Sequence, residues 1–130
     1  MLVVDDFAGF RHAICSMLSN EPDLLVVAEA SDGLEAVCKA ENLQPDLIVL
    51  DLQLPELNGL EVARRVITLS PKSKIIIASM ETSADFVQEA IRSGALGYVR
   101  KTEMASQLLP TIRAALQGKR FVLGQLDDSG

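Results

Sequence analysis

Residues 46–59 read DLIVLDLQLPELNG, and this stretch decides the fold. Its apolar run, Leu47–Leu50, is continuous rather than alternating, which is typical of a parallel strand buried on both faces. The run ends directly in Asp51, and the turn residues Pro55 and Gly59 follow. The stretch therefore predicts a buried strand that delivers a carboxylate to a loop.

Similar apolar runs recur on both sides of this stretch, and a segment with helical spacing follows each of them. A βα unit repeated in this way has right-handed crossovers, so helices cover both faces of one parallel sheet. We therefore predict an α/β doubly wound fold with five strands and five helices. The predicted strands are Leu2–Val4, Leu24–Ala28, Leu47–Leu50, Ile75–Ala78 and Gly97–Val99.

Turn and capping residues support this division of the chain. Ser31-Asp32-Gly33 is predicted to cap the second helix, and Gly94 is predicted to end the fourth. The first helix is predicted from the apolar spacing of Phe7, Phe10 and Ile14.

Composition limits the classes of function. The formal net charge of −6 over 130 residues argues against nucleic-acid binding by this chain alone. No apolar run approaches the ~20 residues that a membrane span needs. Asp5 and Asp6 interrupt the N-terminus too early for a signal peptide. We expect a cytoplasmic protein with no membrane contact.

Polar residues directly follow the predicted strands. In a doubly wound sheet, ligands bind beyond the carboxyl ends of the strands, so these residues should share one edge. Taken singly, each has an ordinary explanation as a helix cap, a turn residue, a strand-end hydroxyl or a solvated lysine. Their joint occurrence favours a functional site made of Asp5, Asp6, Asp51, Ser79 and Lys101.

The chemistry of these groups indicates phosphoryl transfer. Two carboxylates ~4 Å apart repel by about 4 kcal/mol at an effective dielectric of ~20, so three of them should bind a cation such as Mg²⁺. Lys101 and the Ser79 hydroxyl could then hold the oxygens of a phosphoryl group. This leaves Asp51 as the nucleophile that forms an acyl phosphate.

With these residues in view, the sequence resembles the receiver domain of bacterial two-component response regulators across almost the whole chain. The resemblance implies a flavodoxin-like receiver with strand order 2-1-3-4-5. Only four residues precede the acidic pair, so we expect a short first strand. The segments that carry the resemblance are Val3–Asp6, Asp46–Gly59, Ile77–Met80 and Gly97–Lys101.

The resemblance also implies a role for each site residue. Asp51 is the expected phosphoacceptor, and Lys101 contacts it and the phosphoryl oxygen. Asp6 and Asp51 are expected to ligate Mg²⁺ by their side chains, and Gln53 by its backbone carbonyl. Asp5 is expected to lie behind these ligands and to act through water.

The resemblance also implies a switch. Ser79, also expected to assist catalysis, and Tyr98 form the expected switch pair: the hydroxyl moves to the phosphate and the ring turns inward. We hypothesise that Gln53 and Glu81, each two positions after a site residue, tune dephosphorylation. The switched surface is expected around the fourth helix and fifth strand.

Several details resemble the subgroup whose receivers precede a LuxR-type DNA-binding domain, namely Ser79-Met80, Ala95–Val99 and Lys101-Thr102. We therefore expect residues 1–117 to be the receiver and 118–130 to be the start of a linker, with a frayed tail from Gln125 to Gly130 and the output domain absent. The expected partners are a histidine kinase or phosphotransfer protein, a second copy through the helix 4/strand 5/helix 5 face, and DNA only through the missing domain.

Four alternatives stand beside this interpretation. A stand-alone receiver needs no output domain, and a receiver-like module could bind partners without phosphorylation. A haloacid dehalogenase-like phosphatase would need a second carboxylate where Gln53 lies. A flavin-binding electron carrier would need a phosphate-cradling loop where Asp5-Asp6-Phe7 would repel the phosphate. We expect a protein that catalyses only its own phosphorylation and dephosphorylation, and not an enzyme with a separate substrate.

Overall fold

A computed structural model describes residues 1–81 and 83–127 of the chain. The described residues form one sheet of seven strands in the order β2-β1-β3-β4-β5-β6-β7. The strands from β2 to β5 are parallel, which confirms the predicted order 2-1-3-4-5. In chain order the elements are β1 (Leu2–Val4), α1 (Ala8–Leu18), β2 (Ala28–Ala30), α2 (Gly33–Leu43), β3 (Leu47–Leu50), α3 (Gly59–Leu69), β4 (Lys74–Ser79), α4 (Ala84–Arg92), β5 (Gly97–Arg100), the 3-10 helix η1 (Lys101–Glu103), α5 (Met104–Leu116), β6 (Arg120–Val122) and β7 (Gln125–Asp127).

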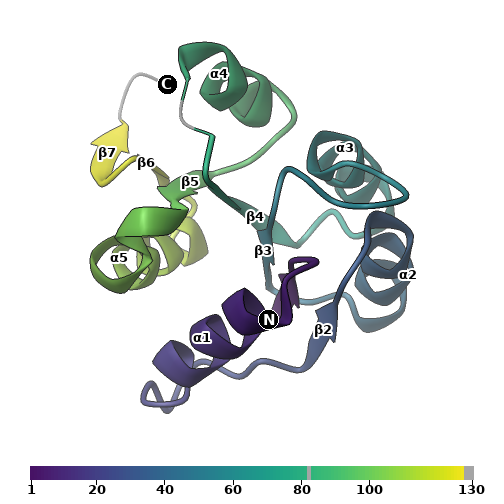
Figure 1. The fold of residues 1–130 in the computed structure, drawn as a ribbon, viewed down its shortest axis with the longest axis horizontal. Helices are drawn as coiled ribbons and strands as arrows, with labels where there is room; N and C mark the ends of the chain where they lie inside the picture. The colour runs from purple at the N-terminus through teal and green to yellow at the C-terminus, as the bar shows by residue number, and fades with distance from the viewer. Residues whose placement is uncertain (82, 128–130) are drawn as a thin grey trace.

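The helices form two layers, with α1 and α5 on one face of the sheet and α2, α3 and α4 on the other (Figure 1). Successive residues of a strand point to opposite faces, so Val3 packs in the core beneath α1 and α5 while Leu2 and Val4 pack in the opposite core. The continuous apolar runs thus fill two cores at once, as the doubly wound fold requires. None of the described helices is long and apolar enough to span a membrane.

The second strand differs from its prediction. β2 covers Ala28–Ala30, whereas the apolar run predicted Leu24–Ala28. The parallel ladder with β1 begins at Leu2, and the carbonyl of Met1 accepts a hydrogen bond of 2.9 Å from the amide of Val27. Earlier in the run, the carbonyl of Leu25 accepts a hydrogen bond of 2.7 Å from the Met1 ammonium, and Met1 lies outside β1. The strand therefore starts where β1 supplies pairing partners, and not where the apolar run starts.

Two further strands extend the sheet past the predicted five. β6 pairs parallel with β5, and the amides of Phe121 and Leu123 donate to the carbonyls of Leu96 and Tyr98, both at 2.9 Å. β7 returns antiparallel to β6. The expected frayed tail is therefore wrong for β7, and residues 128–130 lie outside the described part of the chain. The β6–β7 hairpin covers the edge of β5 that the predicted fold leaves open.

The capping predictions hold. The Asp32 side chain caps α2 by accepting a hydrogen bond of 2.8 Å from the amide of Glu35. Gly94, with a φ of 102°, follows the end of α4 in the left-handed region that glycine tolerates.

Candidate functional site

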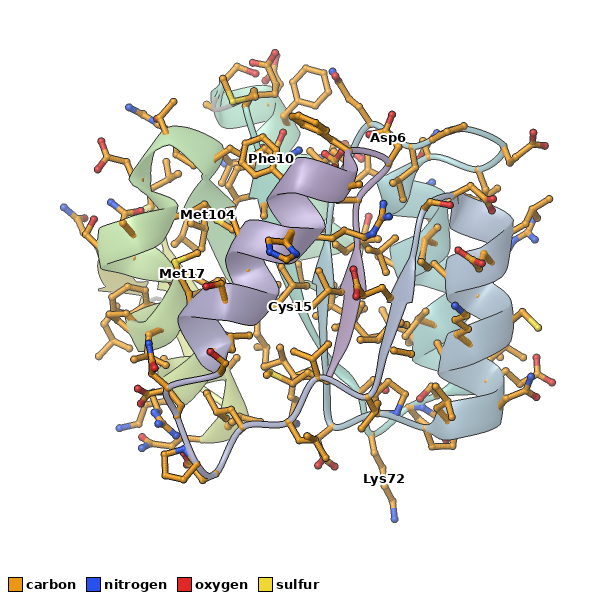
Figure 2. The ribbon with its side chains drawn as sticks, turned by 60° about the horizontal axis from the view of Figure 1, so that its bottom comes forward. Asp6, Phe10, Cys15, Met17, Lys72 and Met104 are labelled. Carbon is orange, nitrogen blue, oxygen red and sulfur yellow. The ribbon has the colours of Figure 1, made fainter. Side chains whose placement is uncertain are left out.

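The carboxyl ends of β1, β3, β4 and β5 meet at one edge of the sheet. Val4 pairs with Leu50, and each is followed directly by an aspartate, Asp5 or Asp51. Figure 2 shows Asp6 and Phe10 at this edge and Lys72 pointing away from the opposite one. The strand register therefore brings together residues that are far apart in the sequence.

The three aspartates form a cluster in which one carboxylate oxygen of each lies within 4.8 Å of the others. Asp5 and Asp51 are buried, at 2% and 5% exposure, while Asp6 is exposed. Backbone amides orient the buried pair: Phe7 donates to Asp5 Oδ1 at 2.9 Å, and Gln53 to Asp51 Oδ1 at 3.2 Å. A set of hard oxygen donors open to solvent on one side fits Mg²⁺, which keeps several waters when it binds protein carboxylates.

Lys101 supplies the positive charge of the site. Its Nζ lies 2.7 Å from Asp5 Oδ2 and 3.3 Å from Asp51 Oδ2, and its side chain is only 8% exposed. The ring of Phe10 lies on another side of the same ammonium, with its centroid 4.4 Å away. One buried ammonium therefore faces two buried carboxylates, and the cluster keeps a net negative charge that a second cation could neutralise.

The pKa of the Asp51 carboxyl is raised above its ordinary value. Burial is the largest cause, and the nearby charge of Asp5 adds to it, while Lys101 opposes both. An ionised Asp51 is therefore held in the folded protein at a cost that the unfolded chain does not carry.

The raised pKa predicts how stability depends on pH without divalent ions. The folded state holds the Asp51 proton to a higher pH than the unfolded state, so the unfolding free energy falls as pH rises from about 4 through the folded pKa. Asp51→Asn removes this fall. We expect the unfolding free energy of Asp51→Asn to gain on that of wild type as the pH rises from 4 to 7, as measured by urea unfolding.

Asp46→Asn is the matched control, because it makes the same change at the other end of the same strand, where the side chain is exposed. An Asp51→Asn advantage that stays constant from pH 4 to pH 7 would contradict the prediction.

Ser79 and Tyr98 lie beside this cluster. Ser79 is 1% exposed, and its hydroxyl accepts a hydrogen bond of 2.9 Å from the amide of Glu81. The Tyr98 ring is fully buried, and its hydroxyl donates to the Glu81 carbonyl. Burial raises the pKa of the Tyr98 hydroxyl, which keeps it protonated as a donor. The ring thus points inward in this structure, while a switching role stays a prediction.

The loop after Asp51 is fixed by two close backbone approaches. A Cβ on Gly59 would lie 2.2 Å from the Asp51 carbonyl oxygen, and one on Gly33 would lie 1.9 Å from the Leu57 carbonyl oxygen. The Gly33 amide also donates to the Pro55 carbonyl at 3.1 Å. The loop is therefore held against α2 and α3 by contacts that only glycine permits.

A cavity of about 400 Å³ opens beside the cluster, lined by residues that include Asp6, Gln53 and Phe86. The Gln53 side chain is exposed, so it is free to reach over Asp51. Glu81 is partly buried, and its carboxylate accepts a hydrogen bond of 3.2 Å from the Ser83 amide. The roles predicted for Gln53 and Glu81 remain predictions.

From its sequence position, Phe10 is predicted only to lie on the apolar face of the first helix. Its contact with Lys101 joins residues 91 positions apart, and helical spacing carries no sign of it. The sequence does contain one indication of this contact: Phe10 follows the Asp5-Asp6 pair by one helical turn, and an aromatic side chain at that distance can reach the same strand ends.

The sequence of this chain matches a known protein family. The model of the response regulator receiver domain matches residues 1–113. Among curated proteins, the chain is 35% identical over 119 residues to the nitrate/nitrite response regulator protein NarL of Escherichia coli, covering 92% of this chain and 55% of that protein. It is 37% identical over 126 residues to the protein-glutamate methylesterase/protein-glutamine glutaminase of Thermotoga maritima, covering 89% of this chain and 37% of that protein.

Solved structures of response regulators resemble this fold closely. A LuxR-family two-component response regulator from Aurantimonas sp. is 32% identical, with a TM-score of 0.88, and the match covers 95% of this chain and 87% of that one. The response regulator domain of Thermotoga maritima CheB is 35% identical, with a TM-score of 0.83, covering 89% and 94%. The chain spans about half or less of the length of the two curated relatives above.

Proposed function

Since this chain belongs to the family of response regulator receiver domains, we propose that it receives a phosphoryl group on Asp51 as one step of two-component signalling. The observation that carries the proposal is the position of the Lys101 ammonium, 2.7 Å from Asp5 and 3.3 Å from Asp51 at a cluster of three carboxylates. A site that pairs a buried carboxylate with a fixed cation suits a group whose negative charge must be neutralised on arrival.

In the proposed transfer, one Asp51 oxygen forms a bond to phosphorus while the bond from phosphorus to the donor atom breaks. The electron pair leaves with the donor, a histidine nitrogen of a kinase or phosphotransfer protein, or the acetate of acetyl phosphate. Lys101 would pair with a phosphoryl oxygen, and the Ser79 hydroxyl would donate a hydrogen bond to another.

Mg²⁺ is the cofactor that this oxygen donor set suits, and it would supply neutralisation of phosphoryl charge. Asp6 and Asp51 would hold it by their side chains and Gln53 by its backbone carbonyl. Asp5, which is already paired with Lys101, would support it through water.

The proposed output is a changed surface. Phosphorylation adds about −1.5 to −2 charge. The Ser79 hydroxyl would then leave the Glu81 amide and donate to the phosphoryl group. The buried ring of Tyr98, on β5, would respond to this movement, and the surface formed by α4 and β5 would change. We also propose that Gln53 and Glu81 set the lifetime of the acyl phosphate by controlling access of water.

LuxR-type relatives suggest where the signal goes. We propose that residues 1–117 act as the receiver of a longer transcription regulator, in which residues 118–130 begin the linker to a DNA-binding domain that is not among these 130 residues. A stand-alone receiver is the second candidate. We further propose a cytoplasmic protein that forms a homodimer through the α4–β5–α5 face and acts on no substrate beyond its own acyl phosphate.

The test is the intact mass of the protein after incubation with acetyl phosphate. We expect one added phosphoryl group in the presence of Mg²⁺ and none when a chelator removes it. The matched control is incubation with acetate and Mg²⁺, which should leave the mass unchanged. An unchanged mass with acetyl phosphate and Mg²⁺ would reject the proposal in favour of a module that binds partners without phosphorylation.

A further inference from the structure

The Lys101 ammonium has protein groups on three sides. Two are carboxylates, Asp5 at 2.7 Å and Asp51 at 3.3 Å, and the third is the face of the Phe10 ring, 4.4 Å from Nζ to its centroid. Only 8% of the lysine side chain is exposed. The aromatic ring therefore occupies a position where water would otherwise solvate the charge.

The ring is itself held in place. Phe10 lies in the first turn of α1, and the Phe7 ring meets it edge to face, with centroids 5.8 Å apart and planes at 73°. The next residue, Arg11, donates from its guanidinium to the Asp5 carbonyl at 2.6 Å, which ties the same turn of α1 to the end of β1. The face of Phe10 is thus fixed relative to the carboxylates as well as to the lysine.

An aromatic face and an aliphatic side chain act differently on an ammonium. The ring quadrupole attracts the cation, and the attraction grows when water is excluded, whereas an aliphatic group only fills space. The ring also makes no hydrogen bond that the ammonium must break. Lysine has a long flexible stem, so a surface that attracts its charge reduces the positions open to it.

We propose that Phe10 is a positioning residue for phosphoryl transfer, which holds the Lys101 ammonium against Asp51 and lets it pass to the arriving phosphoryl oxygen. The inference rests on the proposed function and adds a residue to it. The transfer itself is unchanged: the bond between Asp51 and phosphorus forms as the donor bond breaks, and Phe10 touches neither atom.

The test compares Phe10→Leu, which keeps an apolar side chain without the π face, with Phe10→Tyr, which keeps the face. The rate of phosphoryl addition from acetyl phosphate at saturating Mg²⁺ should fall about three- to thirtyfold in Phe10→Leu and stay near wild type in Phe10→Tyr. Phe121→Leu on β6 makes the same chemical change away from Lys101 and should leave the rate unaltered.

Introducing Phe10→Leu into the Lys101→Met variant distinguishes positioning of the ammonium from a general structural role of Phe10. There, Phe10→Leu should have no further effect on the rate, because the cation it positions is gone. Equal slowing in both backgrounds, or equal slowing by Leu and Tyr, would overturn the proposal while leaving Asp51 as acceptor. Failure of wild type to gain a phosphoryl group would instead reject the proposed function.

A second readout needs no phosphorylation. The ring current of Phe10 should shift the NMR signals of the Lys101 ε-methylene protons to high field, and the shift should vanish in Phe10→Leu and persist in Phe10→Tyr. Unshifted ε-methylene protons in wild type would overturn the contact on which the inference depends.

Discussion

Asp51→Asn is expected to lower the yield of phosphoryl adduct by at least ~100-fold, because it removes the attacking oxygen and no other group can take its place without moving. Asp5 is buried and paired with Lys101, so its oxygens are already engaged. Asp6 is exposed, but it lacks the contact with Lys101 that Asp51 has. The measurement is intact mass against time with acetyl phosphate and Mg²⁺.

Asp46→Asn controls for the chemical change. It converts an exposed aspartate at the amino end of β3, whereas Asp51 follows the carboxyl end of the same strand. This variant should acquire the adduct at the wild-type rate. If Asp51→Asn acquires the adduct as fast as wild type does, the acceptor is another residue, and peptide mapping of the phosphorylated protein would identify it.

Lys101→Met is expected to lower the unfolding free energy by about 3 kcal/mol at pH 7 without divalent ions. Methionine keeps much of the stem and removes the charge, which leaves Asp5 and Asp51 buried beside one another without a cation. Removal of one partner from a buried ion pair costs more than the pair contributes, since the remaining charge is desolvated and unpaired. Urea unfolding measures the difference.

Mg²⁺ provides the diagnostic comparison for this variant. A divalent cation neutralises the same carboxylates, so saturating Mg²⁺ should reduce the difference in unfolding free energy between wild type and Lys101→Met. Lys72→Met, which changes an exposed lysine at the opposite end of the sheet (Figure 2), should stay within about 0.5 kcal/mol of wild type. A loss under ~1 kcal/mol for Lys101→Met would mean that the carboxylates do not depend on this ammonium.

Much of the fold could be predicted because the central strands are buried on both faces. Leu47–Leu50 and Leu2–Val4 coincide with β3 and β1, since a continuous apolar run has few other places in a doubly wound fold. The strands at the edges of the sheet are harder to predict from the sequence. β2 starts where its partner β1 starts. β6 is short and only partly buried, and Gln125 and Leu126 of β7 are exposed, so pairing with a neighbouring strand rather than hydrophobicity determines which residues these strands include.

Most of the candidate site could also be predicted, because its residues follow strands whose ends must meet. Asp5, Asp51, Ser79 and Lys101 lie together as expected, and Tyr98 reaches the Glu81 carbonyl beside them. The contact of Phe10 with Lys101 could not be predicted in this way. It depends on where the first turn of α1 lies relative to Lys101, directly after β5, and helical spacing alone does not specify that position.

The loop from Asp51 to Gly59 has a consequence for how such a domain can diversify. Its path is held by backbone contacts at Gly33 and Gly59, where any side chain would collide with a carbonyl oxygen. Gln53 contributes its amide to Asp51 at 3.2 Å but leaves its side chain in solvent. Mutation of Gln53 can therefore alter the surroundings of Asp51 without displacing Asp51. Under the proposed function, the lifetime of the acyl phosphate can then evolve independently of the residues that form it.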